Sequence, residues 1–163
     1  GNGGTPSKSS SSFHYNDALG TLPTATRTGY TFKGWSTSAN GSVNVSTTTK
    51  VTGNVTYYAI WQINSYTLTV TAGTGGTASG GGSYNYGATA TLKATPSAGY
   101  HFVKWSDGNT NASRTVTVTG NATYTATFEQ DPYLNLDKTS LTFEDAGGTQ
   151  TVKVTSNVNW TVS

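Results

Sequence analysis

An internal duplication constrains the fold of this chain more than any other feature. Residues 29–35, with the sequence Gly-Tyr-Thr-Phe-Lys-Gly-Trp, return seventy positions later as Gly-Tyr-His-Phe-Val-Lys-Trp at residues 99–105. Three more pairs follow the same order along the chain: 3–5 with 75–77, 13–16 with 84–87, and 51–57 with 118–124, at offsets of 72, 71 and 67. Four collinear matches with small drifts predict two copies of one module that differ in loop length.

Within each copy the apolar positions alternate with hydroxyl residues. Tyr66, Leu68 and Val70 are separated by threonines, and the segments before residues 61 and 128 show the same period of two. This period is typical of strands with one buried face, and a content of 33 Thr and 18 Ser favours strands over helices. Only residues 16–19 could open a helical turn, which Gly20 and Pro23 would soon end. We therefore expect a mainly β fold.

The pattern divides the chain into three parts. We predict a first module at residues 1–62, a second at residues 63–130, and a tail at residues 131–163 that has no counterpart in either copy. The tail offers short apolar segments separated by a turn at residues 145–148, which predicts two or three strands. About 33 residues bury too little surface to close an independent sandwich.

Composition excludes several classes of protein. Cysteine and methionine are absent, so disulfide scaffolds, thiolate metal sites and cysteine nucleophiles are ruled out. The formal charge of +2 arises from scattered Lys and Arg, so the basic patch of a nucleic-acid binder is missing. No apolar run approaches the roughly 18 residues of a membrane span, and there is no signal-peptide pattern. We expect neither nucleic-acid binding nor membrane insertion.

Aromatic rings must supply much of the core, because Leu, Ile, Val and Phe together number only 26 of 163 residues. Burying one such ring contributes on the order of 2 to 3 kcal/mol. We expect the rings at matching positions of the two copies, and those that end each copy, to form the structural core. These residues are Tyr30, Phe32, Trp35, Trp61, Tyr100, Phe102, Trp105 and Phe128.

These motifs carry two resemblances. Residues 29–35, together with Tyr-Tyr-Ala-Ile-Trp at residues 57–61, resemble the Listeria-Bacteroides repeat, or internalin B-repeat. Residues 99–105, with the final Tyr-Thr-Ala-Thr-Phe at residues 124–128, resemble its divergent form. The tail resembles the opening third of the Bacteroidetes-associated carbohydrate-binding often-N-terminal (BACON) domain, on the residues 141–143, 147–148, 152–157 and 159–160.

The resemblance implies two tandem β-grasp-like modules followed by a truncated immunoglobulin-like segment. It further implies a secreted or cell-surface bacterial protein without family catalytic residues. Copy two has a strand at residues 66–70 before its Gly-Gly-Thr, whereas copy one has none, so we expect both ends of the sequence to be cut. An unpaired sheet edge recruits partners. We therefore expect this edge of copy one to pair with another chain, by edge-strand self-association, or with the tail.

Glycine-rich and acidic motifs give no support for catalysis. Residues 73–78 fit a dinucleotide fingerprint, but no helix follows to hold a pyrophosphate. Asp107, Asn109 and Asn111 have the spacing of a calcium loop, yet Val118 stands where the bidentate Glu is required. We interpret Asp107 to Asn109 as a hairpin turn, with a weak cation site as the alternative.

The two histidines, His14 and His101, do not fall at matching positions of the copies, and no spacing supports a metal site or a catalytic triad. The seven acids lie in ordinary solvated surroundings, with Glu129 and Asp131 at a module junction and Glu144 and Asp145 beside a turn. We predict no enzymatic activity, no cofactor and no metal.

Two classes of function remain. The first is a non-catalytic spacer or adhesion module of a cell-surface or secreted protein, presenting other domains and contacting a host surface protein. The alternative is a carbohydrate-binding module that docks a glycan or mucin on exposed rings. Tyr58, Tyr84 and Tyr86 are the candidate contacts, because they lie opposite the expected core face or beside the flexible glycines 80–82.

Overall fold

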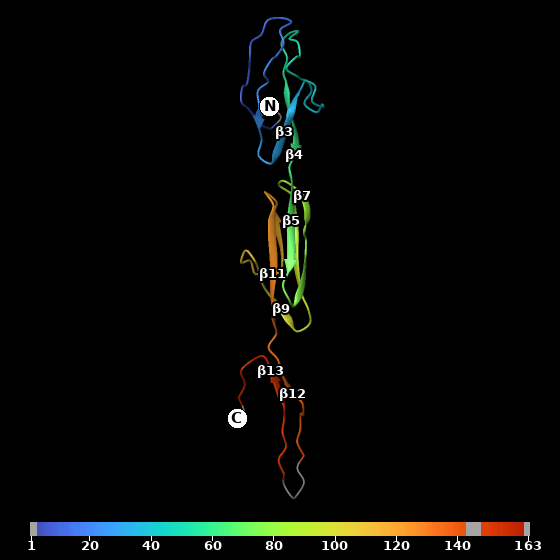
Figure 1. Ribbon diagram of the computed structural model, residues 1–163, viewed down its shortest axis with the longest axis vertical. Coiled ribbons are helices and arrows are strands. Elements are labelled where there is room, and N and C mark those ends of the chain that lie inside the picture. Colours follow the sequence, from blue (N-terminus) through green and yellow to red (C-terminus); the bar gives the residue numbers. More distant parts are fainter. Residues whose placement is uncertain (1–2, 143–147, 162–163) are drawn as a thin grey trace.

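A computed structural model describes residues 3–142 and 148–161 and is built from β-strands (Figure 1). The mainly β fold is thereby confirmed. The first copy of the module (residues 3–62, the first repeat), the second copy (residues 63–130, the second repeat) and the tail follow one another along the long axis. These ranges hold no helix at all, and thus none that could cross a membrane. Residues 16–19, the one segment that could open a helical turn, form none; Asn16 has a positive φ of 66°, and Ala18 forms an isolated bridge with Lys50.

The second repeat contains two sheets. One has the order β7-β5-β11-β9 and the other the order β10-β8-β6. Their strands are β5 (Ser65–Ala72), β6 (Gly76–Ser79), β7 (Gly82–Asn85), β8 (Thr89–Pro96), β9 (Tyr100–Trp105), β10 (Ser113–Thr117) and β11 (Ala122–Gln130). Strand β11 is central: its residues 122–126 pair in parallel with β5, and its residues 126–130 pair antiparallel with β9.

The core of the second repeat lies between these sheets. Trp105, Leu92 and Ala126 are fully buried. The centre of the Phe102 ring lies 5.7 Å from that of the Trp105 indole and 5.9 Å from that of the Phe128 ring. The indole Nε1 of Trp105 donates to the carbonyl of Asn111 at 3.0 Å. The alternation seen in the sequence thus places apolar residues inside and threonines outside.

The first repeat has fewer strands around a smaller core. These are β1 (Thr5–Pro6), β2 (Ala25–Thr26), β3 (Tyr30–Ser36) and β4 (Tyr58–Ile63). Strand β1 pairs with β2, and β3 pairs with β4, both antiparallel. Trp35 is 7% exposed and its Nε1 donates to the carbonyl of Pro23 at 2.7 Å. The other buried apolar residues are Leu19, Ala25, Val45 and Ala59.

Three strands of the second repeat have no counterpart among the described strands of the first. These are β5, its neighbour β7, and β10. By the offset of 67, Val55 corresponds to Ala122 of β11, yet residues 55–57 form no strand and Val55 is 52% exposed. By the offset of 71, Phe13 corresponds to Tyr84 of β7, yet Phe13 lies in an irregular segment and is 42% exposed.

The tail forms one antiparallel pair, β12 (Leu134–Leu136) with β13 (Val154–Ser156). Phe143 and most of the expected turn at residues 145–148 lie outside the described residues. Several large apolar side chains remain exposed: Leu134, Leu136, Leu141, Val158 and Trp160. Among the described residues the tail strands pair with each other and not with the first repeat, and pairing of that edge with another chain stays a prediction.

Candidate functional surfaces

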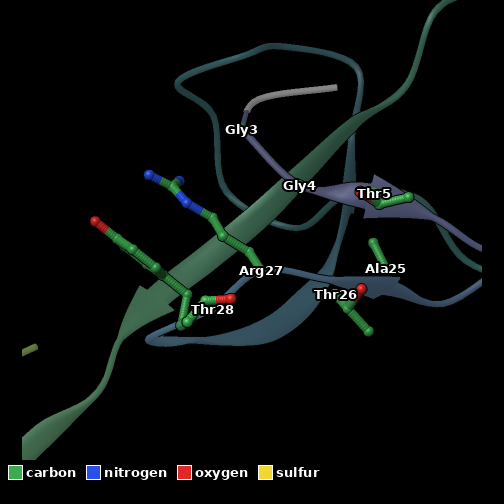
Figure 2. A pocket seen from close by; sticks show the side chains of 8 residues that line it. Gly3, Gly4, Thr5, Ala25, Thr26, Arg27 and Thr28 are labelled. Carbon is green, nitrogen blue, oxygen red and sulfur yellow. The ribbon is translucent and has the colours of Figure 1, made fainter. Parts of the chain in front are cut away.

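A groove of about 530 Å³ opens on the first repeat beside β1 and β2 (Figure 2). Arg27 extends its side chain away from the strands, with its guanidinium carbon 3.7 Å from the centre of the Tyr30 ring. A Cβ added to Gly3 would lie 3.1 Å from the same guanidinium carbon, a tight contact, and Gly3 has a positive φ of 84° that favours glycine. The remaining lining residues are Gly4, Thr5, Ala25, Thr26 and Thr28.

A second concavity of about 330 Å³ shares Arg27 and Tyr30 with the first. Ile60 and Trp61 of β4 form part of its lining, completed by residues 39–41. The indole Nε1 of Trp61 is buried without a hydrogen-bond partner among the described residues. No acidic residue lines either concavity. The surface therefore joins one cation, aromatic rings, hydroxyls and amides, a set suited to a polar ligand that carries a carboxylate.

The second repeat is built differently at the matching place. Ser97 stands at the position of Arg27, seventy residues on, and Tyr100 stands at the position of Tyr30. A Cβ added to Gly75 would come within 2.2 Å of the Tyr100 ring, so the glycine backbone rests directly on the tyrosine. In the first repeat the guanidinium occupies that space. The sequence analysis did not single out Arg27. The signal that could have revealed it is that the two copies differ at this position, with Arg27 in the first and Ser97 in the second.

The three tyrosines predicted to contact a glycan lie at separate places. Tyr58 is half-buried in β4. Tyr84 packs against the core of the second repeat, and its hydroxyl donates to the carbonyl of Gly80 at 2.9 Å. A Cβ on Gly29 would come within 1.9 Å of the Tyr86 ring, so this ring rests on the first repeat. Glycan contact by these residues stays a prediction.

Tyr86 and Asn64 join the two repeats directly. Asn64 is the one residue between β4 and β5; its amide donates to the carbonyl of Gly29 at 2.9 Å, and its carbonyl accepts from the amide of Tyr86 at 2.8 Å. The side-chain oxygen of Asn64 accepts from the Thr31 hydroxyl at 2.6 Å. The ring of Tyr86 contacts that of Tyr66 at 6.4 Å. The junction is therefore short and held from both sides.

Most residues of the expected aromatic core pack in the two clusters. Trp105 and Phe128 lie in the buried cluster of the second repeat, with Tyr100 and Phe102 against it. In the first repeat, Trp35 is buried, and Phe32 and Trp61 pack against its cluster. Tyr30 differs, because its ring lies under Arg27 at the groove.

The polar motifs serve local structure. The Asp107 carboxylate accepts two bonds from Nη1 of Arg114, at 2.7 and 2.6 Å, and one from the amide of Asn109. The hydrogen bond from Arg114 holds the pKa of Asp107 below its ordinary value. Nδ1 of His14 lies 3.4 Å from Oδ2 of Asp17, and Nδ1 of His101 lies 2.9 Å from Oδ1 of Asp131. In the part of the chain that the structure describes, no three potential ligands gather as a metal site would require.

Comparison with known families places most of the sequence. Residues 1–60 match the family model of the Listeria-Bacteroides repeat domain, and residues 66–132 match that of the divergent InlB B-repeat domain. No curated protein and no solved structure matches the chain. Neither family model covers the rest of the tail, so its resemblance to a BACON domain stays a prediction. Repeat domains of this kind are typical of bacterial surface proteins and are generally non-catalytic. The chain thus contains, in tandem, a Listeria-Bacteroides repeat domain at residues 1–60 and a divergent InlB B-repeat domain at residues 66–132.

Proposed function

We propose that the two repeats act as a non-catalytic spacer in a bacterial surface protein, holding the parts that flank them at a set distance. The observation that carries this proposal is the junction. A single residue separates β4 from β5, whereas a flexible linker would need several. Because the repeats follow one another end to end, the chain spans a long distance with few residues (Figure 1).

The contacts of Tyr86 explain how the junction resists bending. The ring lies against Gly29, where any larger residue would collide with it. Backbone bonds from Asn64 to both repeats fix the direction in which β5 leaves β4. Bending here would break two hydrogen bonds and expose a ring, so the two repeats should tumble as one body.

Spin labels test this proposal directly, because the chain has no cysteine that would compete for the label. Lys33→Cys and Lys104→Cys place one label on an exposed position of each repeat. We expect one narrow distance distribution. Tyr86→Ala should broaden it, whereas Tyr15→Ala, at the matching position of the first repeat and 79% exposed, should leave it unchanged. A broad distribution in the parent protein would contradict the spacer function.

Carbohydrate binding is a second candidate, favoured by the groove at Arg27 and Tyr30. Its volume of about 530 Å³ suits a small ligand, and a guanidinium held on a ring can bind a sugar carboxylate. A glycan array that includes acidic sugars tests this role. Arg27→Ala should abolish binding, and Lys33→Ala, which removes the same charge from an exposed part of β3, should not. Equal binding by the parent and Arg27→Ala would refute it.

A further inference from the structure

The joint between the second repeat and the tail has the same hydrogen-bonded frame as the joint between the two repeats. In the joint between the repeats, the amide of Asn64 donates to the carbonyl of Gly29 at 2.9 Å. In the joint to the tail, the amide of Asp131 donates to the carbonyl of Gly99 at 2.8 Å. The carbonyl of Asp131 then accepts from Nδ2 of Asn157 in the tail at 2.9 Å, as the carbonyl of Asn64 accepts from the second repeat. Both joints are therefore held from two sides.

Three side chains of this shared frame are neutral in the first joint and titratable in the second. The first joint has Thr31, Gln62 and Asn64, and the second has, at offsets of 70, 67 and 67, His101, Glu129 and Asp131. We call the second set the titratable cluster. Its register is that of the first joint, because Thr31 pairs with Gln62 between β3 and β4, and His101 pairs with Glu129 between β9 and β11.

The contact between the strand and the joint residue is also retained. Nδ1 of His101 lies 2.9 Å from Oδ1 of Asp131, where the Thr31 hydroxyl lies 2.6 Å from Oδ1 of Asn64. Glu129 lies directly opposite His101, and such cross-strand neighbours share one face of the sheet. The side chains of His101 and Asp131 are 52% and 48% exposed, so water and protons reach them. A protonated imidazole here has a carboxylate on either side.

Few other charges adjoin this cluster. Lys104, three residues further along, is the one other charged residue of β9 and β11. Residues 97–99 before β9, and the tail strands β12 and β13, carry none. Tyr133 follows in the connection to the tail, and lysine and tyrosine side chains titrate well above the range of histidine. Between pH 5 and 8, His101 is therefore the group of this joint that changes charge.

The second joint also lacks the ring that braces the first. A Cβ on Gly29 would collide with the Tyr86 ring, whereas a Cβ on Gly99 would meet nothing within 4 Å. Residues 131–133 separate β11 from β12, compared with one residue between β4 and β5. With a longer connection and no ring against the glycine, the second joint depends more on the side-chain contact of Asp131.

We propose that the joint between the second repeat and the tail is a pH-sensitive hinge, which stiffens when His101 is protonated. A hydrogen bond between imidazolium and carboxylate is roughly twice as strong as one between neutral groups. The hinge therefore stiffens as the pH falls from 8 to 5 and loosens as the pH rises again. Thr31, Gln62 and Asn64 do not titrate, so the joint between the repeats keeps one stiffness throughout.

Two spin labels across the second joint of the whole chain test this proposal. Lys93→Cys on β8 and Lys153→Cys beside β13 are exposed positions away from the cluster. From about pH 8 to about pH 5, the ratio of the main distance to the remaining distances should rise about twofold to fivefold, the change that one exposed ion pair can produce. The same ratio at both pH values would overturn the proposal.

Exchanging residues between the matched positions identifies the group responsible. His101→Thr introduces the residue of the first repeat, and Asp131→Asn keeps the oxygen that contacts the ring while removing its charge. Either variant should abolish the pH response. His14→Thr is the control, because His14 also lies beside an aspartate but is 98% exposed in the first repeat, and its loss should leave the response intact. A response that survives in His101→Thr would refute the hinge.

The label pair at Lys33 and Lys104 separates this proposal from the spacer function, which concerns the other joint. Its distance distribution should be the same at both pH values. A broad distribution for this pair would contradict the spacer function alone. A pH response of this pair equal to that across the second joint would contradict the hinge, because the first joint has no titratable group at the matched positions.

Discussion

The two repeats share their motif and their loop frame, yet they differ in how much of each becomes sheet. Residues 55–57 and 122–124 have the same alternating pattern, but only the latter form a strand. Strand β5 makes the difference, because it pairs with that half of β11 and with β7. A partner strand therefore decides whether a segment of β pattern becomes a strand, which agrees with the strong dependence of β propensity on context.

The comparison extends to the cores. In the second repeat, Trp105 and Leu92 have no exposed surface, whereas Trp35 of the first repeat keeps 7%. The rings of Tyr84 and Tyr124 close the second core from the side of β5, and their counterparts include the exposed Phe13. The second repeat should therefore hold more of the stability of the chain.

Removing the central indole of each repeat should give the largest effect. Trp105→Ala is expected to destabilise the second repeat by about 3–5 kcal/mol. Trp35→Ala should cost the first repeat less, since its indole is less enclosed. Urea unfolding followed by circular dichroism measures both, with Trp160→Ala, 45% exposed, as the control of little effect. Equal losses would mean that the two cores are equivalent despite the missing strand.

Glycines 29 and 99 offer a sharper comparison at the junction. Both have positive φ, 77° and 76°, but a Cβ on Gly29 meets the Tyr86 ring, while a Cβ on Gly99 meets nothing within 4 Å. Gly99→Ala should cost only the backbone strain, roughly 1 kcal/mol. Gly29→Ala should add a steric penalty, reaching about 2–4 kcal/mol.

Thermal unfolding of the two variants measures this difference. The double variant of Gly29→Ala with Tyr86→Ala is the control, because removing the ring should relieve the added penalty. Equal effects of the two single variants would show that Tyr86 does not rest on Gly29 in solution.

The sequence indicated the repeats through their self-similarity at a spacing of about 70 residues and the strands through local periodicity. Residues 65–72 and 122–130 alternate strictly, and each forms a strand. The junction could not be found in this way, since Gly29 and Tyr86 are 57 positions apart and meet only when two folded repeats adjoin. Tyr86 beside a glycine-rich turn resembled a free surface ring for the same reason.

Local sequence patterns did not predict the groove at Arg27 and Tyr30 either. Tyr30 shares its motif with Tyr100 and was expected to share its packing, but one substitution between the copies, Arg27 for Ser97, changes what lies on the ring. In the tail, the alternating Val152 and Val154 predicted a strand. Strand β13 begins at Val154 and does not include Val152. Periodicity thus predicts elements, while long-range contacts determine surfaces.

The hydroxyl of Tyr84 should give a moderate effect. Tyr84→Phe removes its hydrogen bond to the carbonyl of Gly80 and should cost about 1 kcal/mol in chemical unfolding. The first repeat already has phenylalanine, Phe13, at the matching position. Because Phe13 is exposed, Phe13→Tyr should change stability little. A large change there would mean that the Phe13 ring is packed in solution.

The smallest effect should come from the ion pair that only the second repeat contains. Asp107 and Arg114 are partly exposed, so Asp107→Asn should cost roughly 0.5 kcal/mol at neutral pH. Because folding lowers the pKa of Asp107 from 3.8, its contribution is present above that pH and is lost as the pH falls through the lower pKa of the folded state. The parent and the variant should therefore converge in stability below pH 3.8, as measured by urea unfolding at a series of pH values. A constant difference for Asp107→Asn down to the lowest pH would mean that its carboxylate acts through packing and not through charge.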